Sequence, residues 1–173
     1  MNQVWRKAFV LIGLVFILGG TPSWGAPPNN DESDALGNTA GGSGALQNNT
    51  TGAANTADGA GALSANTTGG SNTAIGSFAL PVNTTGDNNT ASGAYALYSN
   101  TTGSNNTASG VVALVSNTTG FYNTASGAFA LYANTGGIVN TASGAYALFS
   151  NTTGSLNTAS GVNALAKIGR AHV

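Results

Sequence analysis

Side chains that could act as bases, as thiol or amine nucleophiles or as metal ligands are scarce in this sequence. Between residues 26 and 166 there is no Cys, His, Lys or Arg. The acidic residues of that segment are Asp31, Glu32, Asp34, Asp58 and Asp87. Acid–base and covalent catalysis need positioned groups of these types, and Asp58 and Asp87 occupy different positions of the repeat described below, so they form no carboxylate pair. The sequence therefore predicts no enzyme, no cofactor and no metal site.

Basic residues are confined to the two ends of the chain. They are Arg6, Lys7, Lys167 and Arg170. Nucleic-acid binding depends on Lys and Arg that neutralise phosphates, so the segment between them is not expected to bind nucleic acid or anionic lipid. The glycines of "GGSGA", Gly41–Ala45, lack the Lys of a phosphate-binding loop and are repeat glycines.

Amide and hydroxyl side chains recur instead, with a period of 17 residues. We number each unit from the Asn of Asn-Thr-Thr-Gly, so that Asn83 is position 1 and Ser99 is position 17. An Asn-Thr-Ala-x-Gly element begins at Asn38, Asn55, Asn72, Asn89, Asn106, Asn123, Asn140 and Asn157. Position 15 is always Leu and position 14 always Ala. Such a strict repeat buries its apolar side only by stacking on its neighbours, as in a solenoid.

The composition of the unit favours strands and turns. Gly, Asn and Thr are weak helix formers, so we predict an all-β, parallel β-roll or β-solenoid with 17-residue coils. The segment Asn-Thr-Thr-Gly is typical of a turn, because Asn and Gly accept left-handed backbone conformations. Asn side chains stacked along the axis can bond to one another. The expected ladder consists of Asn66, Asn83, Asn100, Asn117, Asn134 and Asn151.

Alternation within a strand suggests which side chains face inward. We expect Ala91, Gly93 and Ala96 to fill the coil interior, with a bend near Gly93, and Thr90 and Ser92 to face water. Positions 15 and 13 are then expected to pack against other chains. The proposed interface comprises Leu63, Leu80, Leu97, Leu114, Leu131 and Leu148, with Phe78, Tyr95, Val112, Phe129 and Tyr146.

The ends of the sequence differ from the repeats. Residues 1–25 have a basic start and a short apolar run, which is typical of a secretory signal peptide. Residues 26–37 are expected to be a flexible leader and residues 38–166 the repeat array. Ile168–Val173 leave the repeat frame and match the translation of a sequencing adapter, so residues 167–173 are interpreted as an artefact.

The repeats resemble the head repeats of trimeric autotransporter adhesins, the YadA-like or haemagglutinin-type family, whose units read small residue, x, Ala, x, Gly. The resemblance covers residues 38–166. It implies a left-handed parallel β-roll wound as a homotrimer on a bacterial surface or outer membrane, used for attachment to an unidentified extracellular ligand. Membrane contact would come only through a C-terminal anchor that this sequence lacks.

Two other functions remain open at the level of sequence. The repeats are also similar to fibre shafts, which would make the array purely structural. Stacked Thr could instead bind ice, although the two Thr of Asn-Thr-Thr-Gly are consecutive rather than separated by one residue. That row includes Thr67, Thr84, Thr101, Thr118 and Thr152.

Overall fold

The computed structural model describes residues 34–167, and this part of the chain is all-β. The expected signal peptide and the adapter-like residues 168–173 lie outside the described residues. Eight strands of three residues each recur once per repeat. They are β1 (Thr39–Gly41), β2 (Thr56–Asp58), β3 (Thr73–Ile75), β4 (Thr90–Ser92), β5 (Thr107–Ser109), β6 (Thr124–Ser126), β7 (Thr141–Ser143) and β8 (Thr158–Ser160).

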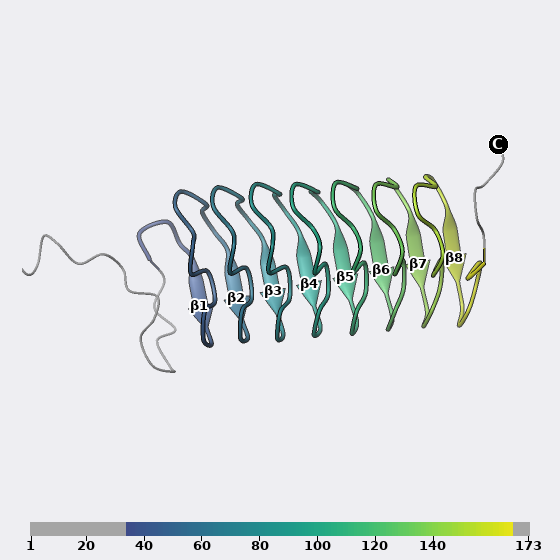
Figure 1. Cartoon of the computed structure of the whole chain (residues 1–173), viewed down its shortest axis with the longest axis horizontal. Helices are drawn as coiled ribbons and strands as arrows, with labels where there is room; N and C mark the ends of the chain where they lie inside the picture. Colours follow the sequence, from purple (N-terminus) through teal and green to yellow (C-terminus); the bar gives the residue numbers. More distant parts are fainter. Residues whose placement is uncertain (1–33, 168–173) are drawn as a thin grey trace, which may run out of the picture.

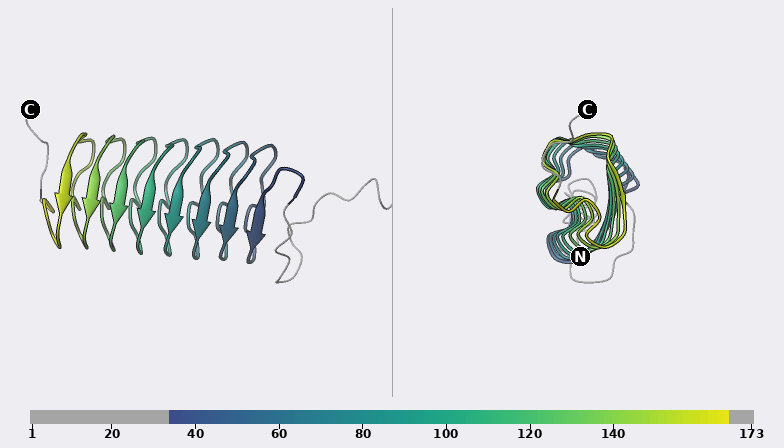
Figure 2. Two further views of the ribbon diagram at one scale, coloured as in Figure 1. Left: turned by 180° about the vertical axis from the view of Figure 1, so that it is seen from behind. Right: turned by 90° about the vertical axis from the view of Figure 1, so that its right-hand side faces the viewer.

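The strands form one parallel sheet in the order of the sequence, β1 to β8. Each residue pairs with the equivalent residue of the next repeat, as Thr90 does with Thr107 and Ala91 with Ala108. One turn of the chain therefore takes 17 residues, and the turns stack into a rod (Figure 1). Seen along the rod, successive turns nearly superpose (Figure 2). The predicted parallel β-solenoid is confirmed, whereas its left-handed winding and its assembly as a trimer stay predictions.

Alanine and leucine fill the interior of the rod. Ala91 and Ala96 are completely buried, as predicted. The prediction that the leucines pack between chains is wrong, because they are completely buried within a single chain. They are Leu63, Leu80, Leu97, Leu114, Leu131 and Leu148. Full burial of one such side chain contributes about 1.5–3 kcal/mol, so this row is a principal apolar contribution to stacking.

The backbone conformation explains why two adjacent residues both face inward. Ala96 and Leu97 lie in a turn that follows a bend at Gly93, not in a strand, so strand alternation does not apply to them. Tyr95 and Leu97 both have left-handed backbone angles, with φ of 59° and 52°. Such angles are uncommon for residues with a bulky side chain. Here they direct Leu97 inward and leave Tyr95 exposed.

The asparagines of position 1 form the predicted ladder inside the rod. Asn83 Nδ2 donates to Oδ1 of Asn66 at 2.8 Å, and Asn100 Nδ2 donates to Oδ1 of Asn83 at 2.9 Å. The same amide nitrogen also donates to the carbonyl of the glycine three residues later, as Asn83 does to Gly86. Between Asn66 and Asn134 these side chains are completely buried. The buried amides therefore find in the ladder the hydrogen-bond partners that water would otherwise supply.

A second ladder, which the sequence analysis did not predict, runs through the asparagines of position 7. Oδ1 of Asn89 accepts two hydrogen bonds from Asn106, one from the backbone N–H at 3.0 Å and one from Nδ2 at 3.2 Å. Nδ2 of Asn106 also donates to the carbonyl of Gly120, 2.8 Å away in the next coil. No buried side-chain polar atom between residues 34 and 167 lacks a partner, which limits the cost of burying these amides.

The glycine of Asn-Thr-Thr-Gly is required for space and not for a left-handed backbone. Gly86 has no positive φ angle, but a Cβ on it would collide with the carbonyl of Gly103 and the side chain of Asn83. The expectation of left-handed residues in this segment is therefore wrong. They lie instead at positions 6, 11, 13 and 15, represented by Asn88, Gly93, Tyr95 and Leu97.

Asp34 closes the N-terminal end of the second ladder. Its Oδ1 accepts the backbone N–H of Asn38 at 2.8 Å, and its Oδ2 accepts Asn38 Nδ2 at 3.0 Å. The carboxylate thus takes the place that an Asn Oδ1 would hold in a preceding coil. Residues 34–37 were expected to belong to a flexible leader, but the described end of that segment is tied to the first coil by these bonds.

Asn106→Ala tests the second ladder. The change removes the acceptor of the Asn123 backbone N–H and the donor to Gly120. Because an unpaired buried polar group costs about 1–3 kcal/mol, we expect the free energy of unfolding to fall by about 2–3 kcal/mol. Urea unfolding followed by circular dichroism measures the loss. The control is Ser109→Ala, an exposed change that should leave stability within about 0.5 kcal/mol; equal losses in both variants would contradict the role of the ladder.

The Asp34 cap predicts acid sensitivity at the start of the rod. Partial burial raises the pKa of this carboxyl. The hydrogen bonds from Asn38 and Leu36 lower the pKa by more than burial raises it, so the pKa lies below its ordinary value. The cap therefore stabilises the fold above the unfolded-state pKa of about 3.9 and loses this effect as pH falls through the lowered value.

We expect the protection of the Asn38 and Thr39 amides from hydrogen exchange, expressed relative to the unfolded chain, to fall at acid pH in the wild type. Asp34→Ala should show low protection for these amides at neutral pH as well, with a weaker pH dependence. An unchanged protection of Asn38 in this variant would show that the carboxylate does not hold the first coil.

Candidate functional site

Two surfaces of the rod repeat the same chemistry from coil to coil. The first, the hydroxyl face, consists of the outward side chains of positions 8 and 10 in β4–β8. Its residues are Thr90, Ser92, Thr107, Ser109, Thr124, Ser126, Thr141, Ser143, Thr158 and Ser160, and all are exposed. The Ala between each pair is buried. The prediction that Thr90 and Ser92 face outward is confirmed, because the strand alternates as a pleated strand should.

In β1–β3 the same sheet continues with different side chains. Position 8 is Thr in all three strands, but position 10 is Gly41, Asp58 and Ile75. The regular pattern of two hydroxyl rows therefore begins at β4.

The hydroxyl groups of this face are free, whereas those of the Thr-Thr segment are in use. Thr67 Oγ1 donates to the carbonyl of Thr84 at 2.9 Å, and Thr84 Oγ1 donates to that of Thr101 at 3.1 Å. Among residues 34–167, no hydroxyl of the hydroxyl face has a hydrogen-bond partner. The position 2 threonines thus join coils, and the position 8 threonines of β4–β8 are left to bind water or a ligand.

The second surface, the aromatic stripe, consists of the apolar side chains of positions 13 and 16 between Phe78 and Phe149 that are exposed or half-buried. Its residues are Phe78, Tyr95, Tyr98, Val112, Val115, Phe129, Tyr132, Tyr146 and Phe149. Tyr95 and Tyr146 are 44% and 41% exposed. The rings stack along the rod: the centroids of Phe129 and Tyr146 lie 5.0 Å apart with an interplanar angle of 3°. The stripe is therefore an ordered apolar surface rather than a set of independent side chains.

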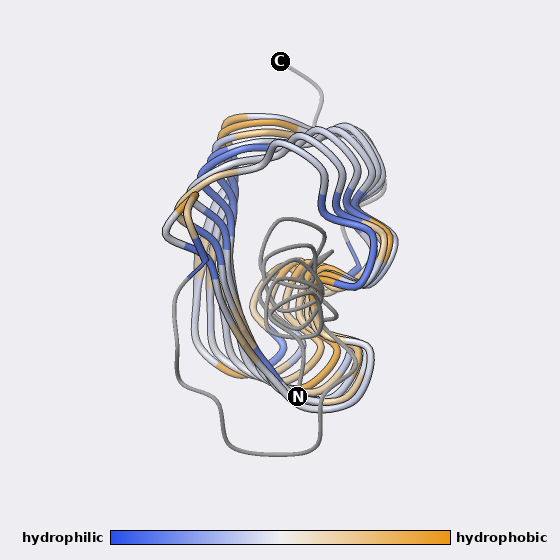
Figure 3. Cartoon of the chain, turned by 90° about the vertical axis from the view of Figure 1, so that its left-hand side faces the viewer, coloured by the Kyte–Doolittle hydropathy of each residue, from blue (hydrophilic) through white to orange (hydrophobic). Residues whose placement is uncertain are grey.

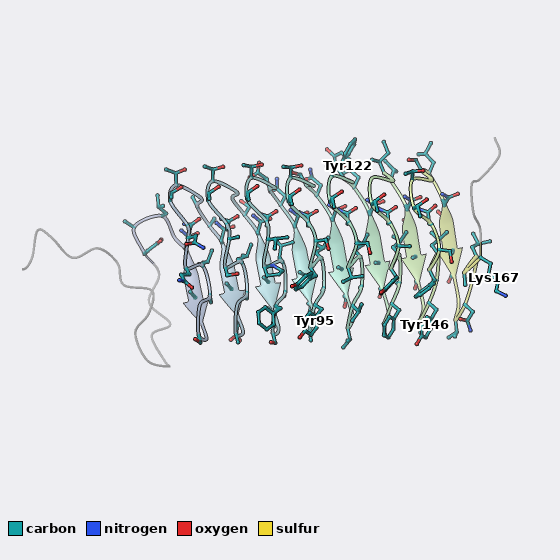
Figure 4. All side chains as sticks on the ribbon, in the orientation of Figure 1. Tyr95, Tyr122, Tyr146 and Lys167 are labelled. Atoms are coloured by element: carbon teal, nitrogen blue, oxygen red, sulfur yellow. The ribbon has the colours of Figure 1, made fainter. Side chains whose placement is uncertain are left out.

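The aromatic stripe and the hydroxyl face do not coincide. In Figure 4 the labelled Tyr95 and Tyr146 lie along the lower edge of the rod, and the strands lie above them. Tyr122, at position 6, projects from the opposite, upper edge (Figure 4). Figure 3, coloured by hydropathy, shows the apolar and polar segments separated around the cross-section. One coil thus offers chemically different sides.

The residues of the predicted interface fall into two groups in the structure, one interior and one at the surface. Its leucines are interior, as described above, while its position 13 residues remain at the surface. Phe78, Tyr95 and Tyr146 are exposed, and Val112 and Phe129 are half-buried. Position 16, represented by Tyr132 and Phe149, was not predicted to belong to this surface, although both rings stack at 4.8 Å. The signal available in the sequence was their recurrence three residues after position 13, which brings each ring near a position 13 ring.

The charged residues of the described segment do not gather into a metal site. Asp87 Oδ1 accepts the Gly70 backbone N–H at 2.7 Å, so this carboxylate joins two coils. Between residues 34 and 167 no cluster of three His, Cys, Asp or Glu side chains is suited to hold a metal ion. Nor does the chain form, in this same range, any helix that is long and apolar enough to span a membrane.

Comparison with known proteins gave no match, whether to family models, to curated proteins or to solved structures. The class that the structure defines is a parallel β-solenoid with 17-residue coils.

The two roles of threonine can be separated by matched substitutions. Thr84→Val removes a hydrogen bond to the Thr101 carbonyl, whereas Thr90→Val removes an exposed hydroxyl without a partner within the described chain. A net hydrogen bond contributes about 0.5–1.5 kcal/mol. We therefore expect Thr84→Val to lower the free energy of unfolding by about 1 kcal/mol and Thr90→Val to leave it unchanged, both measured by urea unfolding. A larger loss for Thr90→Val would reverse the assignment.

Proposed function

We propose that this chain is a segment of an exported bacterial surface adhesin or fibre, in which the solenoid forms a homotrimeric rod that carries attachment. The observation that carries the proposal is the aromatic stripe. Apolar side chains follow the rod over successive coils, with rings on both sides of the coil that carries Val112 and Val115, and no charged residue stands at position 13 or 16 from Phe78 to Phe149. Extended apolar surfaces of this kind mark sites of protein association.

The stripe is suited to packing against copies of itself. Phe78 and Tyr95 stack with an interplanar angle of 18°, and Tyr132 and Phe149 with one of 13°. Rings stacked face to face along the rod turn their edges outward, so the stripe presents apolar surface that a neighbouring chain can cover. Three identical rods placed in parallel would each cover the stripe of another, as a closed rotational assembly requires.

Attachment is then a property of the whole rod and not of one pocket. The asparagine ladders hold every coil in the same register, so each outward face repeats with the coil period. Multivalent display of weak sites raises apparent affinity by about 10²- to 10⁴-fold without any new contact. A purely structural shaft would have the same rod and the same assembly but no attachment, and the experiment below distinguishes the two.

Two matched triple variants test the assembly. The stripe variant is Tyr95→Asn/Phe129→Asn/Tyr146→Asn, and the chain itself places Asn163 at the same position with φ of 57°. The control variant is Tyr122→Asn/Val139→Asn/Leu156→Asn. These control residues are exposed, and like those of the stripe variant they have left-handed backbone angles. Asn88 and Asn105 hold the same position in other coils.

We expect a trimer for the wild type and the control, and a folded monomer for the stripe variant, because only the stripe variant loses the apolar surface between chains. Light scattering gives the mass and circular dichroism the β content. A monomeric wild type at micromolar concentration would refute the trimer.

To measure attachment, the chain is displayed on non-adherent bacteria, and the fraction of bacteria retained on cell monolayers and on glass is counted. The comparison is with bacteria that display a rod with half the coils. Gradual loss of retention with coil number supports adhesion. Retention no higher than that of undecorated bacteria would leave only the structural shaft.

A further inference from the structure

We propose that the hydroxyl face of β4–β8 is a binding site for ice, a function distinct from the assembly and attachment proposed above. The site is the double row of Thr and Ser hydroxyls, and its ligand is a crystalline layer of water molecules. Three properties of the described residues support it: the spacing of the rows, the availability of the hydroxyls and the rigidity of the surface below them.

The spacing is two-dimensional and follows from the sheet. Thr90 and Thr107 are register partners on neighbouring strands, as are Ser92 and Ser109, and neighbouring strands lie about 4.8 Å apart. Within one strand the two hydroxyls are two residues apart, or about 6.6 Å. The face therefore presents a rectangular net of hydroxyls. Ice presents its water oxygens in planar nets with repeats of similar size.

The hydroxyls are available to an external partner. Each can donate one hydrogen bond and accept two, and none of those on the face is bonded within residues 34–167. A hydroxyl can therefore take the place of a lattice water, and the Thr methyl groups can lie between neighbouring waters. The face carries no charged side chain and no aromatic ring. This composition favours a water lattice over an anion, which needs positive charge, or a polysaccharide, whose sugar rings stack on aromatic side chains.

The surface is held in place from below. The Ala between each Thr and Ser is buried. Gly93, which follows Ser92, donates its backbone N–H to the carbonyl of Ile75 in the preceding coil at 2.8 Å. On the other side of the strand, the Thr90 N–H donates to the Asn106 carbonyl at 2.8 Å. Successive coils nearly superpose along the rod (Figure 2). Binding therefore needs little ordering of the face, which lowers its entropic cost.

The Thr-Thr segment is not an equivalent site. Its position 2 hydroxyls donate to carbonyls of the next coil, as Thr84 does, and its position 3 row is interrupted by Gly136. It nevertheless supplies a control, because Thr85, Thr102 and Thr119 are exposed and lie in the same coils as Thr90, Thr107 and Thr124.

The test measures thermal hysteresis and the shape of ice crystals for the full chain and two triple variants. The face variant is Thr90→Tyr/Thr107→Tyr/Thr124→Tyr, which inserts three bulky neutral side chains into the net. The control variant is Thr85→Tyr/Thr102→Tyr/Thr119→Tyr. Circular dichroism establishes that both variants keep the β signal of the wild type.

We expect hysteresis and faceted crystals for the wild type and the control, and loss of both for the face variant. Thr90→Ser/Thr107→Ser/Thr124→Ser, which keeps the hydroxyls and removes the methyl groups, should reduce hysteresis without abolishing it. If the face variant loses its β signal, this milder variant decides the same question. Absence of hysteresis in the wild type overturns the proposal, as does equal loss in face and control variants. Binding of the wild type to crystalline cellulose without shaping of ice would also overturn it.

Discussion

The interaction on which the whole rod depends is the hydrogen bond between identical asparagine side chains in successive coils. An amide has both a donor and an acceptor, so Asn89 can accept from Asn106 while it donates to Asn72. The pattern can continue through any number of coils, provided that the coil length never changes. Because both ladders are buried, a coil of another length would leave amides unpaired at a cost of about 1–3 kcal/mol each. The strict 17-residue repeat follows from this constraint.

The interior is narrow, and this decides which side chains reach the surface. Alternating strand geometry would send one of two adjacent residues outward, yet Ala96 and Leu97 are both buried. The left-handed conformations of Tyr95 and Leu97 make this possible. The strain of such angles is offset by the burial of Leu and by hydrogen bonds to both neighbouring coils, since Tyr95 N–H donates to Ser77 and Leu97 N–H to Ala113. The aromatic stripe is the outward consequence of the same turn.

Residues of one type have different roles according to their place in the coil. Threonine at position 2 donates its hydroxyl to the next coil, whereas the position 8 threonines of β4–β8 have hydroxyls without a partner in the described part of the chain. Asparagine is buried in a ladder at positions 1 and 7, but exposed at position 6 in Asn88. At the start of the described segment an aspartate takes the acceptor role of asparagine, since the Asp34 carboxylate accepts the backbone N–H and Nδ2 of Asn38.

The sequence by itself determined the coil length, the parallel in-register sheet and the first asparagine ladder, because a period of 17 admits one register. It also determined that Ala91 faces inward and that Thr90 and Ser92 face outward, because strand alternation fixes the faces of Thr-Ala-Ser. It also contained the second ladder, as an Asn recurring in every unit, but a recurring Asn has many possible partners until the coil closes. Only the tertiary structure decided the side on which Leu97 lies, because left-handed angles at bulky residues are disfavoured locally and are stabilised by packing between coils. The aromatic stripe, the free hydroxyls and the Asp34 cap also depend on the tertiary structure, because each is defined by contacts made or left unmade once the chain has folded into coils.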